Sequence, residues 1–407
     1  MVATNVNDLD LPYLDLLNAQ TRAERRQLLD AVRRSDHWLV RTPGGYLITT
    51  YEDSVAVLRD RRFHNFASRL AEFAGVTDPE FLARQRPSIL ASEGDMHARL
   101  RRLVAPAFTP KAADRLRPYM DEVMNRLVDA FAADGRTEFV EDVCEPYPIP
   151  IICRLLGAPE EDWKLFSRWA SDLLRVFNFN FDEDLPLIMA AQDEVGAYVR
   201  ELIERRRVTP AEDLLTDLIA AEEAGDRLST DELESMAVAV LVAGTDTTRN
   251  LLACTVATFT EHPDQWRLLA EQPELASRAV EESMRYLGTI GGTGRFASED
   301  IVYRDVLFPV DTAVSTSFVA ANNDESVFAN PEVFDITKES PPQPQLTFGS
   351  GIHYCLGAWL ARAEMQQALP ILARRLPDLG VDGEIEWKPN FVGIWGPARM
   401  PLTFTPC

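Results

Sequence analysis

Apolar residues along the chain recur mostly at helical spacing, with strand-like patterns confined to two regions. Thr21–Asp36 (TRAERRQLLDAVRRSD) predicts an amphipathic helix that opens with a threonine cap and a glutamate three residues later. Trp38–Tyr51 (WLVRTPGGYLITTY) predicts two short strands around a Pro-Gly-Gly turn. From Met96 to about Arg206 we expect a series of amphipathic helices. The prolines expected to separate them are Pro106, Pro110, Pro146, Pro148 and Pro159.

The longest helical candidate is Ser229–Pro263, with a capping signal at Thr230 and an end before the final proline. Its middle is almost entirely apolar, so we expect it to be buried on every side. After Arg285 the pattern changes to strand-like runs and turns, up to about residue 324. No repeat, low-complexity tract or polar linker divides the chain. We therefore predict a mainly α fold with a small β-rich part, forming one domain over residues 1–407, with strands at about 38–51 and 295–320.

Composition narrows the class of protein. The 407 residues include 41 Lys and Arg against 64 Asp and Glu, a net charge of −23. This argues against binding to nucleic acid or to anionic membranes, since phosphates attract basic surfaces. Five scattered cysteines are too few for a disulfide framework and indicate a reducing cytoplasm. Because we see neither a signal peptide nor an apolar run of roughly 18 residues, we expect a soluble cytoplasmic protein without a membrane span.

One cysteine stands in an unusual setting, in the stretch TFGSGIHYCLGAWLARAE from Thr347 to Glu364. Gly349 and Gly351 can take positive φ angles and bring the backbone close to a flat object. A helical pattern follows, so Cys355 lies at or just before a helix N-terminus, where N–H groups favour a thiolate. Such a sulfur suits an axial metal ligand better than a nucleophile, and no Cys or His at suitable spacing completes a zinc site. A buried structural cysteine remains the alternative.

Three further patterns carry polar groups into apolar or helical settings. Ala243–Thr248 (AGTDTT) places small residues, a carboxylate and hydroxyls in the long buried helix, where threonine can bond back to a carbonyl and bend the helix. Glu282 and Arg285 share one helical face, as do His97 and Arg101. The last pair could clamp carboxylates. The alternatives are a helix kink, an exposed ion pair and a solvated basic face.

Taken together, these segments resemble the cytochrome P450 family. The resemblance rests on the haem-binding loop, and it extends in the same order over nearly the whole chain. The loop residues that match are Phe348, Gly349, Gly351, His353, Cys355, Gly357, Leu360, Ala361 and Arg362. It implies a haem held between a long central helix and the helix that follows the cysteine loop.

The resemblance also implies a role for each site residue. Cys355 would be the axial ligand of the iron of haem b, and Asp246 and Thr247 the acid–threonine pair that delivers protons to bound dioxygen. Glu282 and Arg285 would form a buried structural pair. The remaining residues that would contact the haem, its propionates included, are His97, Arg101, Arg295, Phe348, Gly349, His353, Gly357, Ala243 and Gly244.

Some positions depart from the family pattern. Asn323 and Val333 stand where arginines are usual, which puts in doubt the third member of the buried ion network. Gln345 replaces a frequent histidine. The stretch after Arg285 is rich in glycine and lacks a common proline, but no Gly-Lys-Ser/Thr makes it a phosphate loop.

The implied reaction is insertion of one oxygen atom from O2 into an apolar small molecule, of terpenoid, steroid, fatty-acyl or polyketide-like type. With no reductase domain in the sequence, electrons would pass from NAD(P)H through a separate ferredoxin reductase and ferredoxin to a monomeric enzyme. Candidate docking charges are Arg99, Arg102, Lys111 and Arg362. Candidate substrate-pocket residues, some of which could equally be packing residues, are Phe177, Phe179, Phe181, Thr289, Ile290, Ile394 and Trp395.

Two other functions remain open at this point. A haem-dependent peroxygenase or dehydratase would keep Cys355 but would not need the acid–threonine pair. A haem-thiolate sensor would share the same loop, although the sequence has no signalling domain.

Overall fold

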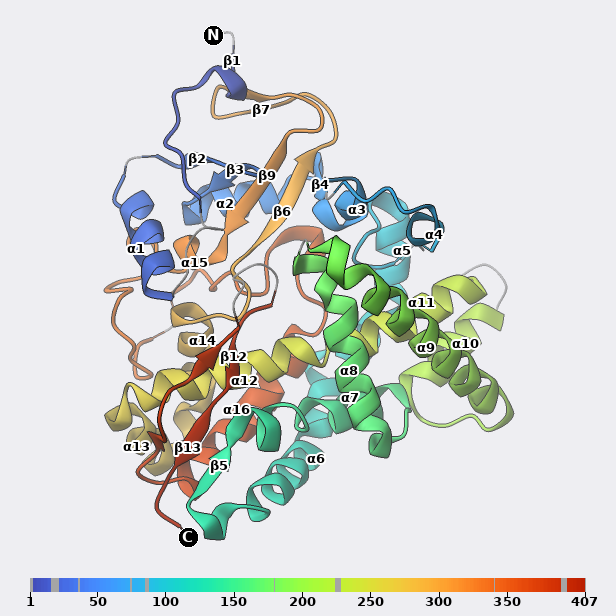
Figure 1. Cartoon of the computed structure of the whole chain (residues 1–407), viewed down its shortest axis with the longest axis vertical. Helices are drawn as coiled ribbons and strands as arrows, with labels where there is room; N and C mark the ends of the chain where they lie inside the picture. The colour runs from blue at the N-terminus through green and yellow to red at the C-terminus, as the bar shows by residue number, and fades with distance from the viewer. Residues whose placement is uncertain are drawn as a thin grey trace.

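The computed structural model describes residues 3–15, 22–35, 37–73, 75–84, 88–178, 180–223, 228–339, 341–388 and 394–406. Helices dominate these residues, as predicted (Figure 1). The α-helices are α1 (Arg22–Arg33), α2 (Tyr51–Arg59), α3 (Leu70–Phe73), α4 (Pro79–Ala83), α5 (Gly94–Val104), α6 (Pro110–Asp129), α7 (Pro148–Leu156), α8 (Trp163–Leu174), α9 (Phe181–Val208), α10 (Leu214–Glu223), α11 (Thr230–Ala243), α12 (Asp246–Thr260), α13 (Pro263–Glu271), α14 (Ala276–Tyr286), α15 (Phe318–Ala321) and α16 (Ala358–Arg375).

Short strands form four small sheets. The strands are β1 (Thr4–Asn5), β2 (Leu39–Thr42), β3 (Gly45–Ile48), β4 (Phe63–Asn65), β5 (Arg136–Glu138), β6 (Gly292–Ala297), β7 (Ile301–Tyr303), β8 (Val306–Phe308), β9 (Ala313–Ser317), β10 (Gly380–Val381), β11 (Glu386–Trp387), β12 (Pro397–Arg399) and β13 (Pro401–Thr403). The largest sheet has the order β2-β3-β9-β6-β4 and joins the two regions predicted to contain strands. The prediction missed β4, which completes this sheet, and also β1, β5 and β10 to β13, which lie outside both regions.

The predicted hairpin is confirmed, with β2 and β3 antiparallel from Leu39 opposite Ile48 to Thr42 opposite Gly45. Gly45 has φ +121°, and a Cβ there would lie 2.4 Å from the carbonyl oxygen of Ala313. The turn therefore needs glycine because β9 runs directly beside it. Tyr51 is not part of the hairpin and begins α2 instead.

The expected single helix from residue 229 to 263 is two helices, α11 and α12, interrupted at Gly244 and Thr245. The Thr245 hydroxyl donates to the carbonyl oxygen of Leu241 at 2.6 Å. A Cβ at Gly244 would lie 2.7 Å from Ile152 Cδ1, so α7 packs directly against the interruption. The longest described helix is instead α9.

The residue that caps α11 and the burial of α11 and α12 can both be compared with the prediction. The cap of α11 is Ser229 rather than Thr230, because Ser229 and Glu232 form a reciprocal capping box. Every residue of α12 from 248 to 259 is buried, but the predicted burial on every side is wrong for the end of α11, where Val238, Ala239 and Val242 are half-buried and Ala243 is exposed. The predicted cap of α1 at residue 21 lies outside the described residues.

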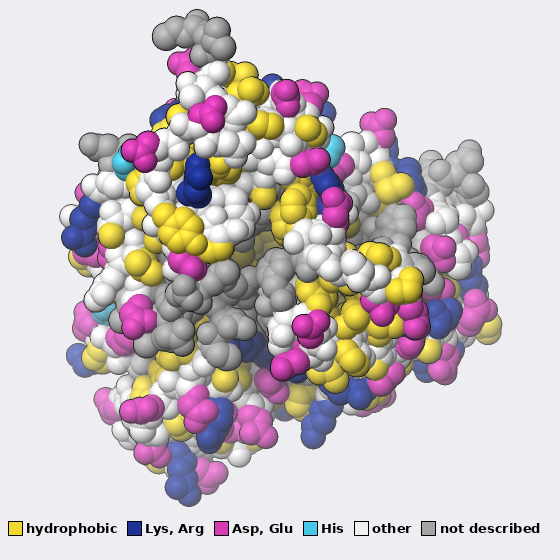
Figure 2. Space-filling view, turned by 45° about the horizontal axis from the view of Figure 1, so that its top comes forward, with side chains coloured by type: hydrophobic (Ala, Val, Ile, Leu, Met, Phe, Trp, Pro, Cys, Tyr) yellow, Lys and Arg dark blue, Asp and Glu magenta, His cyan; other side chains and the backbone are white. Residues whose placement is uncertain are grey.

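The main hydrophobic core joins α6, α7, α11, α12, α14 and α16, in the lower half of Figure 1. The five-stranded sheet and α2 lie above it and enclose a second, smaller core. Acidic and basic side chains are interspersed over the face shown in Figure 2. Within the described part of the chain, no helix is both long and apolar enough to cross a membrane.

Candidate active site

The loop before α16 folds tightly around Cys355. Gly349 and Gly351 have φ angles of +71° and +75°, and a Cβ at Gly351 would lie 2.2 Å from the carbonyl oxygen of Leu58 in α2. The Cys355 N–H donates to the carbonyl oxygen of Phe348 at 2.9 Å, which closes the loop. Both glycines are therefore required by backbone geometry, as the sequence suggests.

The electrostatics at Cys355 favour a cation beside the sulfur. Burial raises the pKa of the thiol, while a hydrogen bond from the Gly357 N–H and the charges of Arg101 and Arg362 act in the opposite direction. Because burial prevails, the protein alone favours the neutral thiol, and a metal cation would favour the thiolate.

Cys355 lines a cavity of about 1770 Å³ whose other walls come from distant segments. Ala243, Gly244 and Thr247 line it at the interruption between α11 and α12. Gly357 lines it too, and a Cβ there would meet no described atom within 4 Å. Small residues therefore face the sulfur-bearing loop across an open space, as a flat cofactor requires.

Four basic side chains on three segments also line this cavity: His97, Arg101, Arg295 and His353. Arg295 is buried, its guanidinium donates to Thr293 Oγ1 at 3.2 Å and to the Gly294 carbonyl at 2.9 Å, and burial lowers its pKa to about 10. No described carboxylate forms an ion pair with Arg295 or Arg101. One buried and one half-buried guanidinium group, neither paired with a described carboxylate, fit an anionic ligand such as the haem propionates.

Sequence reasoning missed an acid in this cluster, Glu93. Its Oε1 lies 3.0 Å from His353 Nε2 and accepts a hydrogen bond from the Asn65 N–H. The His97 and His353 ring centroids are 4.3 Å apart, and burial together with the charges of His353 and Arg101 lowers the pKa of His97 to about 4. The feature of the sequence that could have revealed Glu93 is its position one helical turn before His97.

The side chains of the predicted acid–threonine pair, Asp246 and Thr247, point in different directions. Thr247 lines the cavity, and its hydroxyl donates to the Ala243 carbonyl at 2.8 Å. Asp246 is buried outside the described wall of the cavity, where it forms an ion pair with Arg249 and lies 3.9 Å from Lys388 Nζ. The carboxylate therefore faces a buried cluster of charges, and the hydroxyl faces the open space.

A second acid, Glu364 on α16, also lines the cavity and is absent from our sequence-based predictions. It is buried, and its Oε2 accepts from Thr248 Oγ1 at 3.1 Å. Burial raises its pKa to about 8, so the carboxyl is largely protonated near neutral pH. The signal that could have revealed it is a glutamate on the apolar face of the helix that follows Cys355.

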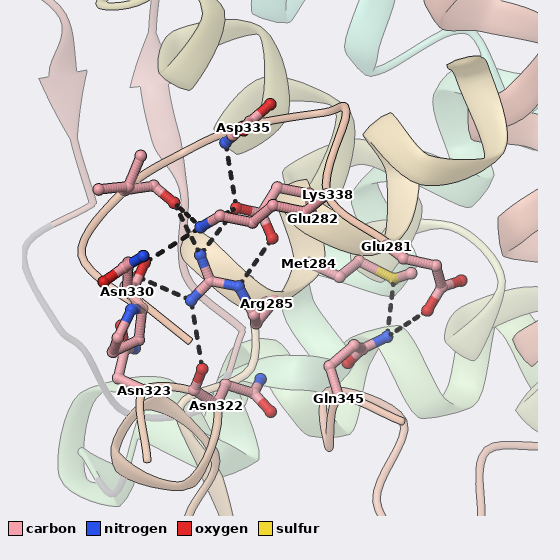
Figure 3. A network of polar contacts seen from close by, with 12 residues as sticks. Glu281, Glu282, Met284, Arg285, Asn322, Asn323, Asn330, Asp335, Lys338 and Gln345 are labelled. Atoms are coloured by element: carbon pink, nitrogen blue, oxygen red, sulfur yellow. Dashed lines mark hydrogen bonds and ion pairs between the residues drawn. The ribbon is translucent and has the colours of Figure 1, made fainter. Parts of the chain in front are cut away.

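Glu282 and Arg285 form a buried bidentate pair on α14, with N–O distances of 2.7 and 2.8 Å (Figure 3). The structure also supplies a third charge, because Lys338 Nζ lies 3.6 Å from Glu282 Oε1. Lys338 donates to the carbonyl oxygen of Val333, and Arg285 donates to it as well. The Val333 carbonyl and the Lys338 ammonium group therefore complete the Glu282–Arg285 network at the place where an arginine side chain is usual.

The other two departures have local roles. Asn323 Nδ2 donates to the Val319 carbonyl at 2.8 Å, which caps α15. Gln345 Nε2 donates to Glu281 Oε2 at 3.2 Å (Figure 3), and its Oε1 accepts from the Thr347 N–H at 2.7 Å. Gln345 therefore ties the start of the cysteine loop to α14.

The predicted substrate-pocket residues separate into two groups. Phe177, Thr289, Ile290 and Ile394 line the cavity. Two others are packing residues outside the described cavity wall: Phe181 contacts Phe81 edge-on at 6.2 Å, and Trp395 stacks on Trp387 at 4.5 Å. Phe179 lies outside the described residues.

Comparison with known proteins agrees with this geometry. Residues 161–376 match the family model of cytochrome P450. The chain is 33% identical over 399 residues to luteothin monooxygenase of Streptomyces thioluteus, covering 97% of this chain and 96% of that protein. It is 36% identical to mycinamicin IV hydroxylase/epoxidase of Micromonospora griseorubida, covering 90% and 91%. Among solved structures, P450BioI in complex with an acyl carrier protein that carries hexadec-9Z-enoic acid has a TM-score of 0.85 and 33% identity, covering 93% and 98%.

Proposed function

The chain belongs to the cytochrome P450 family of monooxygenases, and from this premise we propose that it hydroxylates or epoxidises an apolar small molecule, with electrons from a ferredoxin and its reductase. The observation that carries the proposal is one cavity lined by Cys355, by four basic side chains and by Thr247. A peroxygenase would have no need of Thr247 at the cavity wall.

In this proposal the cofactor is haem b, and each group of residues has a separate task. Cys355 Sγ would bind the iron, the guanidinium groups of Arg101 and Arg295 would bind the propionates, and the two histidines would donate ring N–H hydrogen bonds to them. When bound, thiolate-ligated haem activates O2 and supplies the oxidising chemistry. The protein supplies position, protons and a cavity from which water is displaced.

The proton-carrying groups lie around the interruption between α11 and α12. Thr247 Oγ1 lies at the cavity wall and donates its own proton to the Ala243 carbonyl, so its lone pairs would accept a hydrogen bond from a group in the cavity. Asp246, adjacent in sequence, would resupply that hydroxyl with protons from the buried charged cluster. The interrupted helix aids this role, because it leaves backbone carbonyls free to hold side-chain hydroxyls.

The substrate is expected to be largely apolar, because Phe66, Phe73, Phe177, Ile290 and Ile394 line the cavity. The name of one relative refers to mycinamicin IV hydroxylation, and one similar structure holds a fatty acid carried by a protein. These names support a polyketide-like or fatty-acyl substrate, and a vitamin D(3) 25-hydroxylase among the relatives supports a steroid-like one.

We also propose that the enzyme is a cytoplasmic monomer of one domain. Cys144, Cys153, Cys254 and Cys355 are free thiols in the structure, which supports a reducing compartment.

The proposal is tested with purified holoenzyme, ferredoxin, reductase and NADPH. We expect the reduced, carbon-monoxide-bound enzyme to show the red-shifted absorption band of thiolate-bound haem, and Cys355→Ala to lose it. With a long-chain fatty acid and ¹⁸O2, the product should contain one labelled oxygen atom. Equal product formation from peroxide alone, without ferredoxin, would instead establish a peroxygenase.

A further inference from the structure

A group of polar cavity-lining residues that the haem would not engage lies along α9 and α11. On α9, Gln192, Gly196 and Arg200 follow one another at four-residue spacing and all line the cavity. Glu234 and Ser235 line it from the neighbouring helix α11. We call these five residues the polar wall.

The charged pair of the polar wall spans the two helices. Arg200 Nη1 donates to Glu234 Oε2 at 3.3 Å, and the Glu234 side chain is 11% exposed against 51% for Arg200. A Cβ at Gly196 would lie 3.3 Å from Arg200 Nη1, so the guanidinium folds over the bare backbone at Gly196. Glycine at this position keeps the charged pair flat against the cavity wall.

Gln192 has hydrogen-bonding capacity that the described residues leave unused. Its Oε1 is buried and has no hydrogen-bond partner among them. Gln192 also lines the cavity, so its amide lies beside a ligand bound there. An amide acceptor left unpaired in an apolar environment is costly, so a donor on a ligand would be favoured there.

The polar wall would be unfavourable against a substrate that is apolar throughout, because Gln192 and Ser235 would lose water without gaining a hydrogen bond and the Arg200–Glu234 pair would lose its hydration. Cys355 and the basic residues assigned to the propionates come from other segments: α5, β6 and the cysteine loop. A polar group bound at the wall would therefore leave the apolar part of the substrate for the rest of the cavity.

We propose that the polar wall is a binding subsite for a hydroxyl or ammonium group on an otherwise apolar substrate, with Gln192 and Glu234 accepting its hydrogen bonds. This rests on the proposed monooxygenase function and names the chemistry of its substrate. The group serves as an anchor and is not itself oxidised.

The test uses the holoenzyme and three probes with one apolar chain: dodecan-1-ol, its methyl ether, and protonated N,N-dimethyldodecylamine. The ether keeps the oxygen but lacks the donor. Dissociation constants come from the haem spin-state shift and independently from calorimetry. We expect the alcohol to bind about tenfold more tightly than the ether, and Gln192→Met to reduce that preference to about twofold or less.

The amine distinguishes the two forms of donor. If the amine binds more tightly than the alcohol and Glu234→Gln removes the difference, the subsite takes a cation. If the two bind alike, it takes a hydroxyl. The matched control is Glu201→Gln on α9, a highly exposed glutamate outside the described wall, which should change no dissociation constant.

Equal binding of alcohol and ether to the wild type, no binding of any probe, or a preference that survives Gln192→Met would overturn the subsite. Each variant must first show the carbon-monoxide band. Absence of that band in the wild type would refute the proposed function, whereas its presence with unselective probe binding would refute the subsite alone.

Discussion

At the scale of single residues, Thr247 is the side chain whose replacement tests proton delivery most directly. Its hydroxyl faces the cavity, whereas Asp246 is bound to a charged cluster behind it. In Thr247→Ala we expect electron uptake to continue while product per NADPH falls about tenfold or more, because a positioned proton donor is lost.

The matched control for this substitution is Thr258→Ala on the same helix. Thr258 Oγ1 makes the same kind of bond, to the Cys254 carbonyl at 2.9 Å, but lies outside the described cavity wall. Product and NADPH are measured together in both variants. Unchanged coupling in Thr247→Ala would exclude the proposed role.

The buried carboxyl group of Glu364 should make the stability of the folded protein depend on pH. Its pKa is raised to about 8 in the folded protein, so folding favours the protonated carboxyl. This contribution is complete below the unfolded pKa of about 4.3 and is lost as pH rises through about 8. Thermal unfolding of wild type and Glu364→Gln should coincide below about pH 4, and the variant should be more stable by on the order of a few kcal/mol at pH 9. The exposed Glu384→Gln serves as control, and a difference that stays constant with pH would contradict the expectation.

At the scale of elements, α14 depends on the network in Figure 3. Glu282→Gln should lower the free energy of unfolding by about 3–5 kcal/mol, because it leaves the buried Arg285 without its counter-charge. Lys338→Met should cost only about 1–2 kcal/mol, since this side chain is partly exposed.

Urea unfolding measures both changes. Arg399→Met, which removes an exposed pair with Glu386, should change the free energy of unfolding by about 0.5 kcal/mol or less. Equal effects of Lys338→Met and Glu282→Gln would mean that the lysine is as important to the network as the carboxylate.

Elements were predictable where their cause is local in sequence. The β2–β3 hairpin and the glycines around Cys355 follow from turn chemistry within a few residues. The interruption between α11 and α12 was not predictable, because it also depends on Ile152 of α7 packing on Gly244. Glu93, Lys338 and Glu364 were missed for the same reason: their contacts join segments that are far apart in the sequence.

At the scale of the whole molecule, the net charge of −23 would oppose the approach of the ferredoxin that we propose as electron donor if that protein is also acidic, so local positive charges would have to direct its docking. Two of the four candidate charges are engaged within the protein: Arg99 pairs with Glu232, and Arg362 pairs with Glu281. Arg102 and Lys111 are exposed. They lie on α5 and α6, which flank the cysteine loop, since Arg101 donates to the Tyr354 carbonyl and α6 packs along α16.

We therefore expect the Arg102→Glu and Lys111→Glu double variant to slow reduction by ferredoxin about tenfold or more at low ionic strength, with the difference shrinking as salt is added. Arg136→Glu on β5, compared with each single variant Arg102→Glu and Lys111→Glu, is the control for the change in charge, because β5 lies near the C-terminus, far from α5 in Figure 1. Stopped-flow reduction of the carbon-monoxide-saturated enzyme gives the rates. If the single variants and the control slow equally, only net charge matters; if neither the single variants nor the double variant slows, docking uses another surface.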